Sequence, residues 1–87
     1  MDDNLNCITT TVRVRVNALG VPTNNPQVKY TLKSRPKGIT VLNVTGPLLT
    51  GAPFVTFSLR EGILYFNQVT GLSADKDYDL SIVVYGN

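Results

Sequence analysis

Few side chains of this chain of 87 residues could do chemistry, and the densest group is a set of carboxylates near the C-terminal end. Asp75, Asp77 and Asp79 alternate there, and carboxylate oxygens are the ligands that calcium prefers. The glycine and the later bidentate glutamate of an EF-hand loop are lacking around them. We therefore interpret the three acids as solvated residues of a turn, and we predict neither a metal site nor a cofactor.

Histidine does not occur in the sequence, and this limits catalysis. A serine or cysteine nucleophile activated by histidine is excluded, and the imidazole ligands usual for zinc are missing. No glycine-rich phosphate loop occurs, and a chain of this length rarely forms the cleft that a pair of catalytic carboxylates needs. The sequence predicts a protein that is not an enzyme, and it disfavours a small-molecule ligand.

Cys7 is the only cysteine, so no internal disulfide can form. We predict that Cys7 is a small buried hydrophobic residue near the first strand. An intermolecular disulfide and a reactive thiol remain open as alternatives.

The positive charges gather in one part of the chain. Between positions 13 and 37 there are six cations and no acid, and all six acids lie outside this stretch: the cations are Arg13, Arg15, Lys29, Lys33, Arg35 and Lys37. Two interpretations stay open, namely solvated faces of opposite sign or a surface for an anionic partner, which includes other copies of the chain. A nucleic-acid partner is disfavoured, because Tyr30 is the only aromatic residue of the stretch and alternates onto its apolar side.

Alternation of apolar and polar residues predicts six strands and no helix. We expect the strands at residues 8–18, 27–34, 39–45, 54–59, 63–69 and 78–85. If the first two strands pair, their outward cations share one face of a sheet. We predict this polar contact face at Arg13, Arg15, Lys29 and Lys33. The whole chain, 1–87, is then a single all-β domain.

The C-terminal segment has the most specific pattern. Gly71-Leu72 and a polar turn precede Tyr78, and apolar residues follow Tyr78 at every second position up to Val84. This pattern resembles the tyrosine corner of fibronectin type III and related immunoglobulin-like domains, and Tyr30 to Lys33 resembles their middle strand. The resemblance implies a small sandwich of about six to seven antiparallel strands. It also implies that Leu72 and Tyr78 form a structural corner, with the phenol bonded to upstream backbone.

The chain departs from that family at three points. Ala74 and Asp75 stand where the family has its corner proline and glycine, no tryptophan is present, and no final strand follows Asn87. Either the early strands supply a permuted seventh strand, or one sheet edge is open, and an open edge is a template for another chain. We therefore expect a neighbouring subunit or host surface to cover one edge.

Leu48 and Leu49 lie in a loop bracketed by glycine and proline. They are either an exposed apolar contact for a partner or a plug that closes the open end of the sandwich. We include both among the candidate partner-binding residues.

These observations favour a non-enzymatic structural protein that docks on a larger assembly. A small stand-alone sandwich of this type resembles sandwich modules of bacteriophage proteins. The resemblance implies an accessory protein of the virion, either a capsid decoration protein or a tail protein. Its partners would be capsid or tail subunits and copies of itself, and its location would be the virion, assembled in the host cytoplasm. The start, Met1 to Asn4, does not resemble a signal peptide, and we expect no membrane association.

Two other classes remain. The first is an adhesion or carbohydrate-binding module of a secreted, extracellular multidomain protein, in which Tyr65 and Tyr85 are the only candidates for stacking on sugars. The second is a nucleic-acid-binding barrel, whose affinity would fall steeply with salt.

Overall fold

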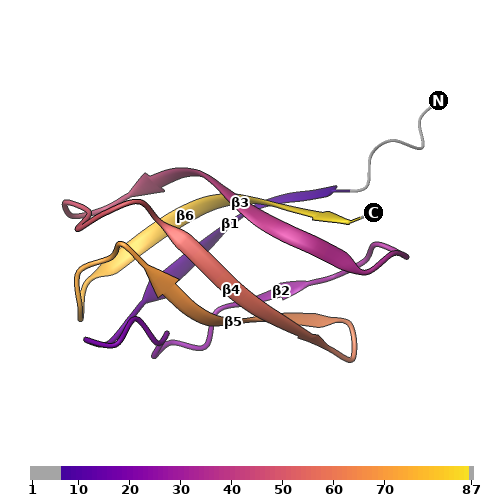
Figure 1. Ribbon diagram of the computed structural model, residues 1–87, viewed down its shortest axis with the longest axis horizontal. Helices are drawn as coiled ribbons and strands as arrows, with labels where there is room; N and C mark the ends of the chain where they lie inside the picture. Colours follow the sequence, from indigo (N-terminus) through magenta and orange to yellow (C-terminus); the bar gives the residue numbers. More distant parts are fainter. Residues whose placement is uncertain (1–6, 87) are drawn as a thin grey trace.

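The computed structural model describes residues 7–86 and shows an all-β protein. Its strands form two antiparallel sheets of three strands, in the orders β1-β6-β3 and β2-β5-β4 (Figure 1). The strands are β1 (Cys7–Arg15), β2 (Gln27–Lys29), β3 (Pro36–Thr45), β4 (Phe54–Arg60), β5 (Ile63–Thr70) and β6 (Asp77–Gly86). Residues 7–86 include no helix that could cross a membrane.

The hydrophobic core lies between the inner faces of the two sheets. The predicted alternation in β6 is confirmed, because Tyr78, Leu80, Ile82 and Val84 are all at most 1% exposed. The second sheet contributes the other half of the core through side chains such as that of Leu64, which is fully buried. A sheet with one apolar and one polar face must bury its apolar face against another apolar surface. The polar outer face of each sheet is therefore the side that is free for contacts.

The predicted hairpin at Arg60 to Ile63 is confirmed. These two residues pair, and Glu61 and Gly62 between them both have positive φ, at 52° and 78°. Two successive residues with positive φ make the two-residue turn that matches the twist of antiparallel strands. The hairpin lies at the same end of the molecule as the 30–35 turn (Figure 1).

Two strands are shorter than predicted. β1 ends at Arg15 because the side chain of Asn17 accepts hydrogen bonds from the backbone N–H groups of Leu19 and Val21 and turns the chain. β2 ends at Lys29, and the next residue, Tyr30, donates its backbone N–H to Gly62 outside the ladder.

The first two strands do not pair, so the condition under which their four cations would share one face is not met. β1 pairs with β6, and β2 pairs with β5 in the other sheet. The physical reason is that β6, whose inner face is wholly apolar, takes the central position of its sheet between β1 and β3.

Candidate docking surfaces

The Tyr78 hydroxyl joins the corner to a distant loop. It accepts a hydrogen bond from the backbone N–H of Ser73 at 2.9 Å and donates one to the carbonyl oxygen of Leu48 at 3.2 Å. Tyr78 and Leu72 are both buried, at 1% and 8% exposed. The predicted bond from the phenol to upstream backbone is therefore confirmed, and it reaches a loop that the sequence did not connect to the corner.

Further bonds hold that loop in place. The backbone N–H of Thr50 donates to the carbonyl of Gly71 at 2.8 Å, and the Ser73 hydroxyl lies 3.4 Å from the carbonyl of Leu48. Gly71 approaches this loop so closely that a Cβ in its place would lie 2.7 Å from the carbonyl oxygen of Ala52. Loop 46–53 and turn 71–76 therefore form one bonded unit.

A third segment, the 17–21 turn, is bonded to the same end of the molecule. Its Gly20 carbonyl accepts the backbone N–H of Val69 at 2.8 Å, and the Gln68 side chain donates to the carbonyl of Leu19 at 2.9 Å. A hollow of about 240 Å³ lies between this turn, Thr50 and Gly71. We call residues 17–21, 46–53 and 71–76 the loop end; it occupies the left side of Figure 1.

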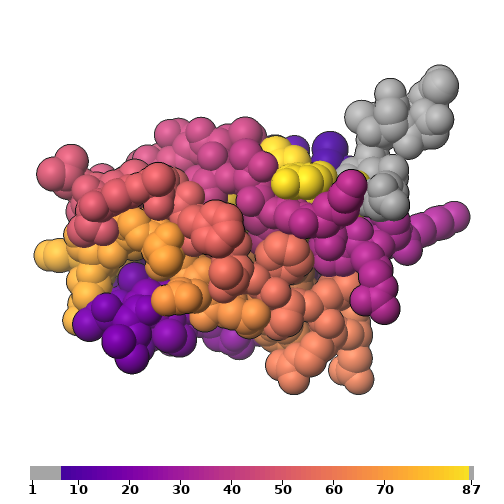
Figure 2. Space-filling view, viewed as in Figure 1, coloured from indigo at the N-terminus to yellow at the C-terminus, as the bar shows by residue number. Residues whose placement is uncertain are grey.

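The structure separates the two leucines of the candidate pair. Leu49 is partly buried and packs against the core, so it closes this end of the molecule. Leu48 is 90% exposed, and loop 46–53 protrudes at the upper left of the molecule in Figure 2. Leu19, on the neighbouring turn, is 75% exposed. The loop end thus presents apolar side chains on a backbone that hydrogen bonds hold in place.

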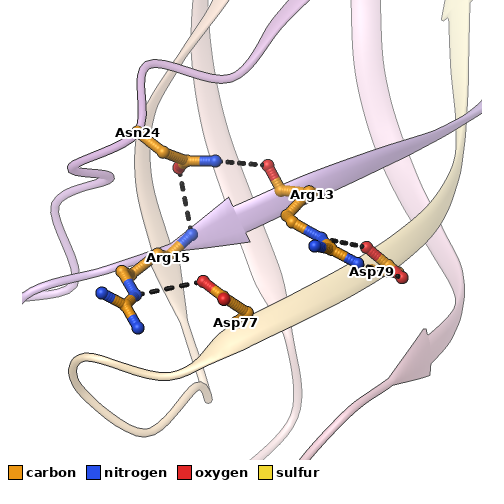
Figure 3. Close-up of polar contacts among 5 residues, drawn as sticks. All are labelled: Arg13, Arg15, Asn24, Asp77 and Asp79. Atoms are coloured by element: carbon orange, nitrogen blue, oxygen red, sulfur yellow. Dashed lines mark hydrogen bonds and ion pairs between the residues drawn. The ribbon is translucent and has the colours of Figure 1, made fainter.

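Two of the predicted contact cations are ion-paired within the protein (Figure 3). Because β1 lies beside β6 in the register Arg13↔Asp79 and Arg15↔Asp77, each guanidinium faces a carboxylate, with Nε 3.0 Å from the carboxylate oxygen in both pairs. The hydrogen bond from Arg13 lowers the pKa of the Asp79 carboxyl below its ordinary value, and the carboxylate raises the pKa of Arg13. Both pairs are exposed, and water screens such pairs, so they add little to stability.

Lys29 and Lys33 lie elsewhere, on β2 and in the segment that follows it. The four predicted cations therefore do not form one face, although a role for each in binding stays a prediction. Apart from Lys76, which belongs to the loop end, the remaining positive charge gathers at the opposite end, around the 30–35 turn and the β4–β5 hairpin (Figure 1). We call this the basic end, and its cations are Lys29, Lys33, Arg35, Lys37 and Arg60.

A groove of about 490 Å³ opens at the basic end between Arg35-Pro36 and the hairpin residues Glu61 and Gly62. Side chains of the 30–37 segment extend from the right of the molecule in Figure 2. Among the ion pairs of residues 7–86, none involves the cations of the basic end. Net positive charge beside an open groove suits an anionic partner surface.

A further sequence expectation is corrected. Cys7 is exposed, not a buried hydrophobic residue, because it lies on the outer face at the start of β1. Asp75 and Asp77 are exposed and Asp79 is half-buried, and Asp77 and Asp79 are each paired with an arginine. No group of three or more metal-ligating side chains occurs in the part of the chain that the structure describes.

The two tyrosines proposed for sugar stacking differ in access. Tyr65 is half-buried, and the guanidinium of Arg60 lies 4.8 Å from the centre of its ring. Tyr85 is 39% exposed. They lie on different sheets, because Tyr65 belongs to β5 and Tyr85 to β6, so they do not form one stacking platform.

Asn24 is a functional candidate that the sequence reasoning missed. Its side-chain amide donates to the carbonyl of Arg13 at 2.8 Å and accepts the backbone N–H of Arg15 at 3.0 Å, so that it occupies the place of a neighbouring strand (Figure 3). The only sequence signal is the asparagine pair in a loop bounded by Pro22 and Pro26, which indicates a turn but not its contact.

Comparison with protein-family models, with curated proteins and with solved structures finds no match for this chain.

Proposed function

We propose that this protein is an immunoglobulin-like β-sandwich that docks, without catalysis, on a larger protein assembly through its loop end. The observation that carries the proposal concerns Leu48. Its side chain is 90% exposed, while its backbone carbonyl accepts a hydrogen bond from the hydroxyl of the buried Tyr78. An apolar side chain on a mobile loop must be ordered when it binds, and this costs conformational entropy. A fixed backbone removes much of that entropic cost, and this is how preorganised contacts gain affinity.

Burial of Leu48 at an interface would change affinity by a measurable amount. Full burial of one leucine side chain contributes about 1.5–3 kcal/mol, which is roughly a tenfold to hundredfold change in affinity. Leu19, on the 17–21 turn of the loop end, is a second exposed apolar side chain, at 75%. The basic end, at the opposite side, remains available for an anionic surface of the same assembly.

The most concrete host for this docking protein is a bacteriophage virion, with the chain attached to capsid or tail subunits. Support for this host comes from the likeness of small stand-alone sandwiches to phage modules, which is an argument from fold type alone. The absence of histidine from the sequence supports a structural role over an enzymatic one.

Density-gradient sedimentation of a native lysate tests the proposal. We expect the wild-type chain to migrate with a large particle rich in one repeated subunit, and Leu48→Ser to remain in the light fractions. Leu42→Ser is the matched control, because Leu42 is also exposed, at 59%, but lies on β3 and not in the loop end. Migration of wild-type protein only as a free small species, or equal behaviour of both variants, would overturn the proposal.

A further inference from the structure

The free edge of β1 is not uniformly protected. The Asn24 amide bonds the carbonyl of Arg13 and the N–H of Arg15, and the backbone N–H of Thr23 donates to the carbonyl of Arg15 at 2.7 Å. These bonds show that the odd-numbered residues of β1 point their backbone groups away from β6. In an antiparallel ladder this alternation continues along the strand. The backbone groups of Thr9 and Thr11 therefore point toward the same free edge.

Within residues 7–86, no backbone or side-chain group bonds this part of the edge. Asn24 covers the edge only up to the arginines, so the unpaired part runs from Cys7 to Val12. The stretch has no charge, no proline and no glycine, and Ile8, Val12 and three threonines are β-branched. Such residues favour strand pairing, and natural proteins normally interrupt them at an open edge.

The other edges of the two sheets are interrupted. β3 begins with Pro36 and contains two shifts of register, and β4 contains one between Thr56 and Phe57. β2 has only three residues and follows the buried Pro26. Irregular or short edges resist the addition of a strand, whereas β1 pairs with β6 without a shift.

We propose that two copies of this protein associate by antiparallel pairing of their β1 edges about a two-fold axis at Thr9. The axis places Thr9 opposite Thr9 and Cys7 opposite Thr11 of the other copy, so every unpaired odd-numbered residue of the stretch gains a partner. Each three-stranded β1-β6-β3 sheet then continues into that of the other copy. A two-fold interface uses the same patch twice, and an uncharged strand meets itself without like-charge repulsion.

Packing favours a second copy over an unrelated strand. In this register Ile8 lies diagonally across from Ile8 and Val12 of the other copy, on the inner face of the continued sheet. These side chains pack against the core but remain partly exposed at the edge, and the second copy gives them apolar neighbours.

Sedimentation velocity over a wide concentration range tests the pairing. We expect wild-type protein to form dimers and Thr9→Pro to weaken the association at least tenfold, because proline removes an outward N–H that the monomer does not use. Thr9→Val keeps this N–H and should dimerise like wild type. Wild-type protein that stays monomeric up to millimolar concentration would overturn the proposal, as would undiminished dimerisation of Thr9→Pro.

Disulfide trapping gives a second readout if Thr9→Pro fails to fold. In a Cys7→Ser background, Thr9→Cys should form a covalent dimer on mild oxidation, because opposed hydrogen-bonded residues lie about 5.5 Å apart at Cα, within disulfide range. Thr40→Cys in the same background is the matched control. Thr9 and Thr40 both pair with Val83 of β6, but Thr40 lies on β3 at the opposite edge of the sheet. Equal trapping at both positions would contradict pairing through β1. Neither experiment involves Leu48, so this inference and the docking proposal fail independently.

Discussion

The side chain of Tyr78 links the corner after β5 to the loop that contains Leu48. Its ring is buried in the core, and its hydroxyl bonds Ser73 and Leu48, the latter thirty residues away in the sequence. The corner therefore does more than end a turn, because it fixes the loop whose leucine is most exposed. The backbone of Leu48 is therefore held in place by the hydroxyl group of Tyr78.

Replacement of Tyr78 by phenylalanine measures this bond. The ring still fills the core, but the carbonyl of Leu48 and the N–H of Ser73 lose their partner, so we expect a loss of about 1–3 kcal/mol in the free energy of unfolding. Urea denaturation gives the value. Tyr85→Phe is the control, because no hydrogen bond of the Tyr85 hydroxyl occurs among the described residues, and it should leave stability nearly unchanged. Equal effects of both variants would contradict the role of the corner hydroxyl.

The Arg13–Asp79 pair predicts a pH effect at a single residue. The hydrogen bond from Arg13 lowers the pKa of Asp79 in the folded protein, so the pair's stabilising contribution is present at neutral pH and is lost as the pH falls through that lowered pKa. We expect Arg13→Gln to return the pKa of Asp79 toward its ordinary value. Carboxyl-carbon NMR titration gives the pKa directly.

Lys29→Gln removes the same charge from the other sheet and is the control for Arg13→Gln. It should leave the Asp79 titration in place, because no contact joins Lys29 to that carboxylate. A pKa of Asp79 that Arg13→Gln does not raise would show that the ion pair is not populated in solution.

At the scale of elements, Asn24 sets the limit of the β1 edge. Asn24→Ala should free the backbone carbonyl of Arg13 and the N–H of Arg15, and should accelerate hydrogen exchange of the Arg15 amide. The accompanying loss of stability should be about 0.5–1.5 kcal/mol. Asn67→Ala is the matched control, since Asn67 accepts a bond only from the Ser58 side chain and leaves the backbone ladder intact. Unchanged exchange at Arg15 would refute the edge-capping role.

Local pattern predicted the strands but not their neighbours. The alternation in β6 and the glycine of the β4–β5 turn are local properties, and both predictions are confirmed. The pairing of β1 with β6 joins residues more than sixty positions apart, as with Arg13 and Asp79, and no local signal specifies such a partner. For the same reason the sequence suggested a shared basic face, whereas the register gives each β1 arginine an acid.

The candidate site was predictable only in part. The position of Leu48-Leu49 between glycine and proline indicated a loop, but no local pattern shows that Leu49 is partly buried against the core while Leu48 is exposed. Asn24 could not be found, because an asparagine side chain that replaces a strand is visible only when the edge of β1 is known. Exposure of Cys7 likewise follows from its place on the outer face of β1.

For the whole molecule, the fold redistributes the charge asymmetry of the sequence. Two cations of the basic stretch are neutralised by the acids of β6, and the others lie at the basic end around the open groove. The apolar loop end lies at the opposite side (Figure 1). Within residues 7–86 the molecule therefore has two chemically different ends, and β1 pairs with β6 without a shift of register, unlike the other long edge strands β3 and β4.

Site-specific photo-crosslinking in native cells is the measurement that tests the docking claim most directly. A photoreactive amino acid at position 48 should yield one discrete product with a subunit that mass spectrometry identifies as the repeated protein of a large particle. The same group at position 42, exposed on β3, should give little of that product. No discrete product from position 48, or the same product in equal yield from both positions, would contradict docking through the loop end.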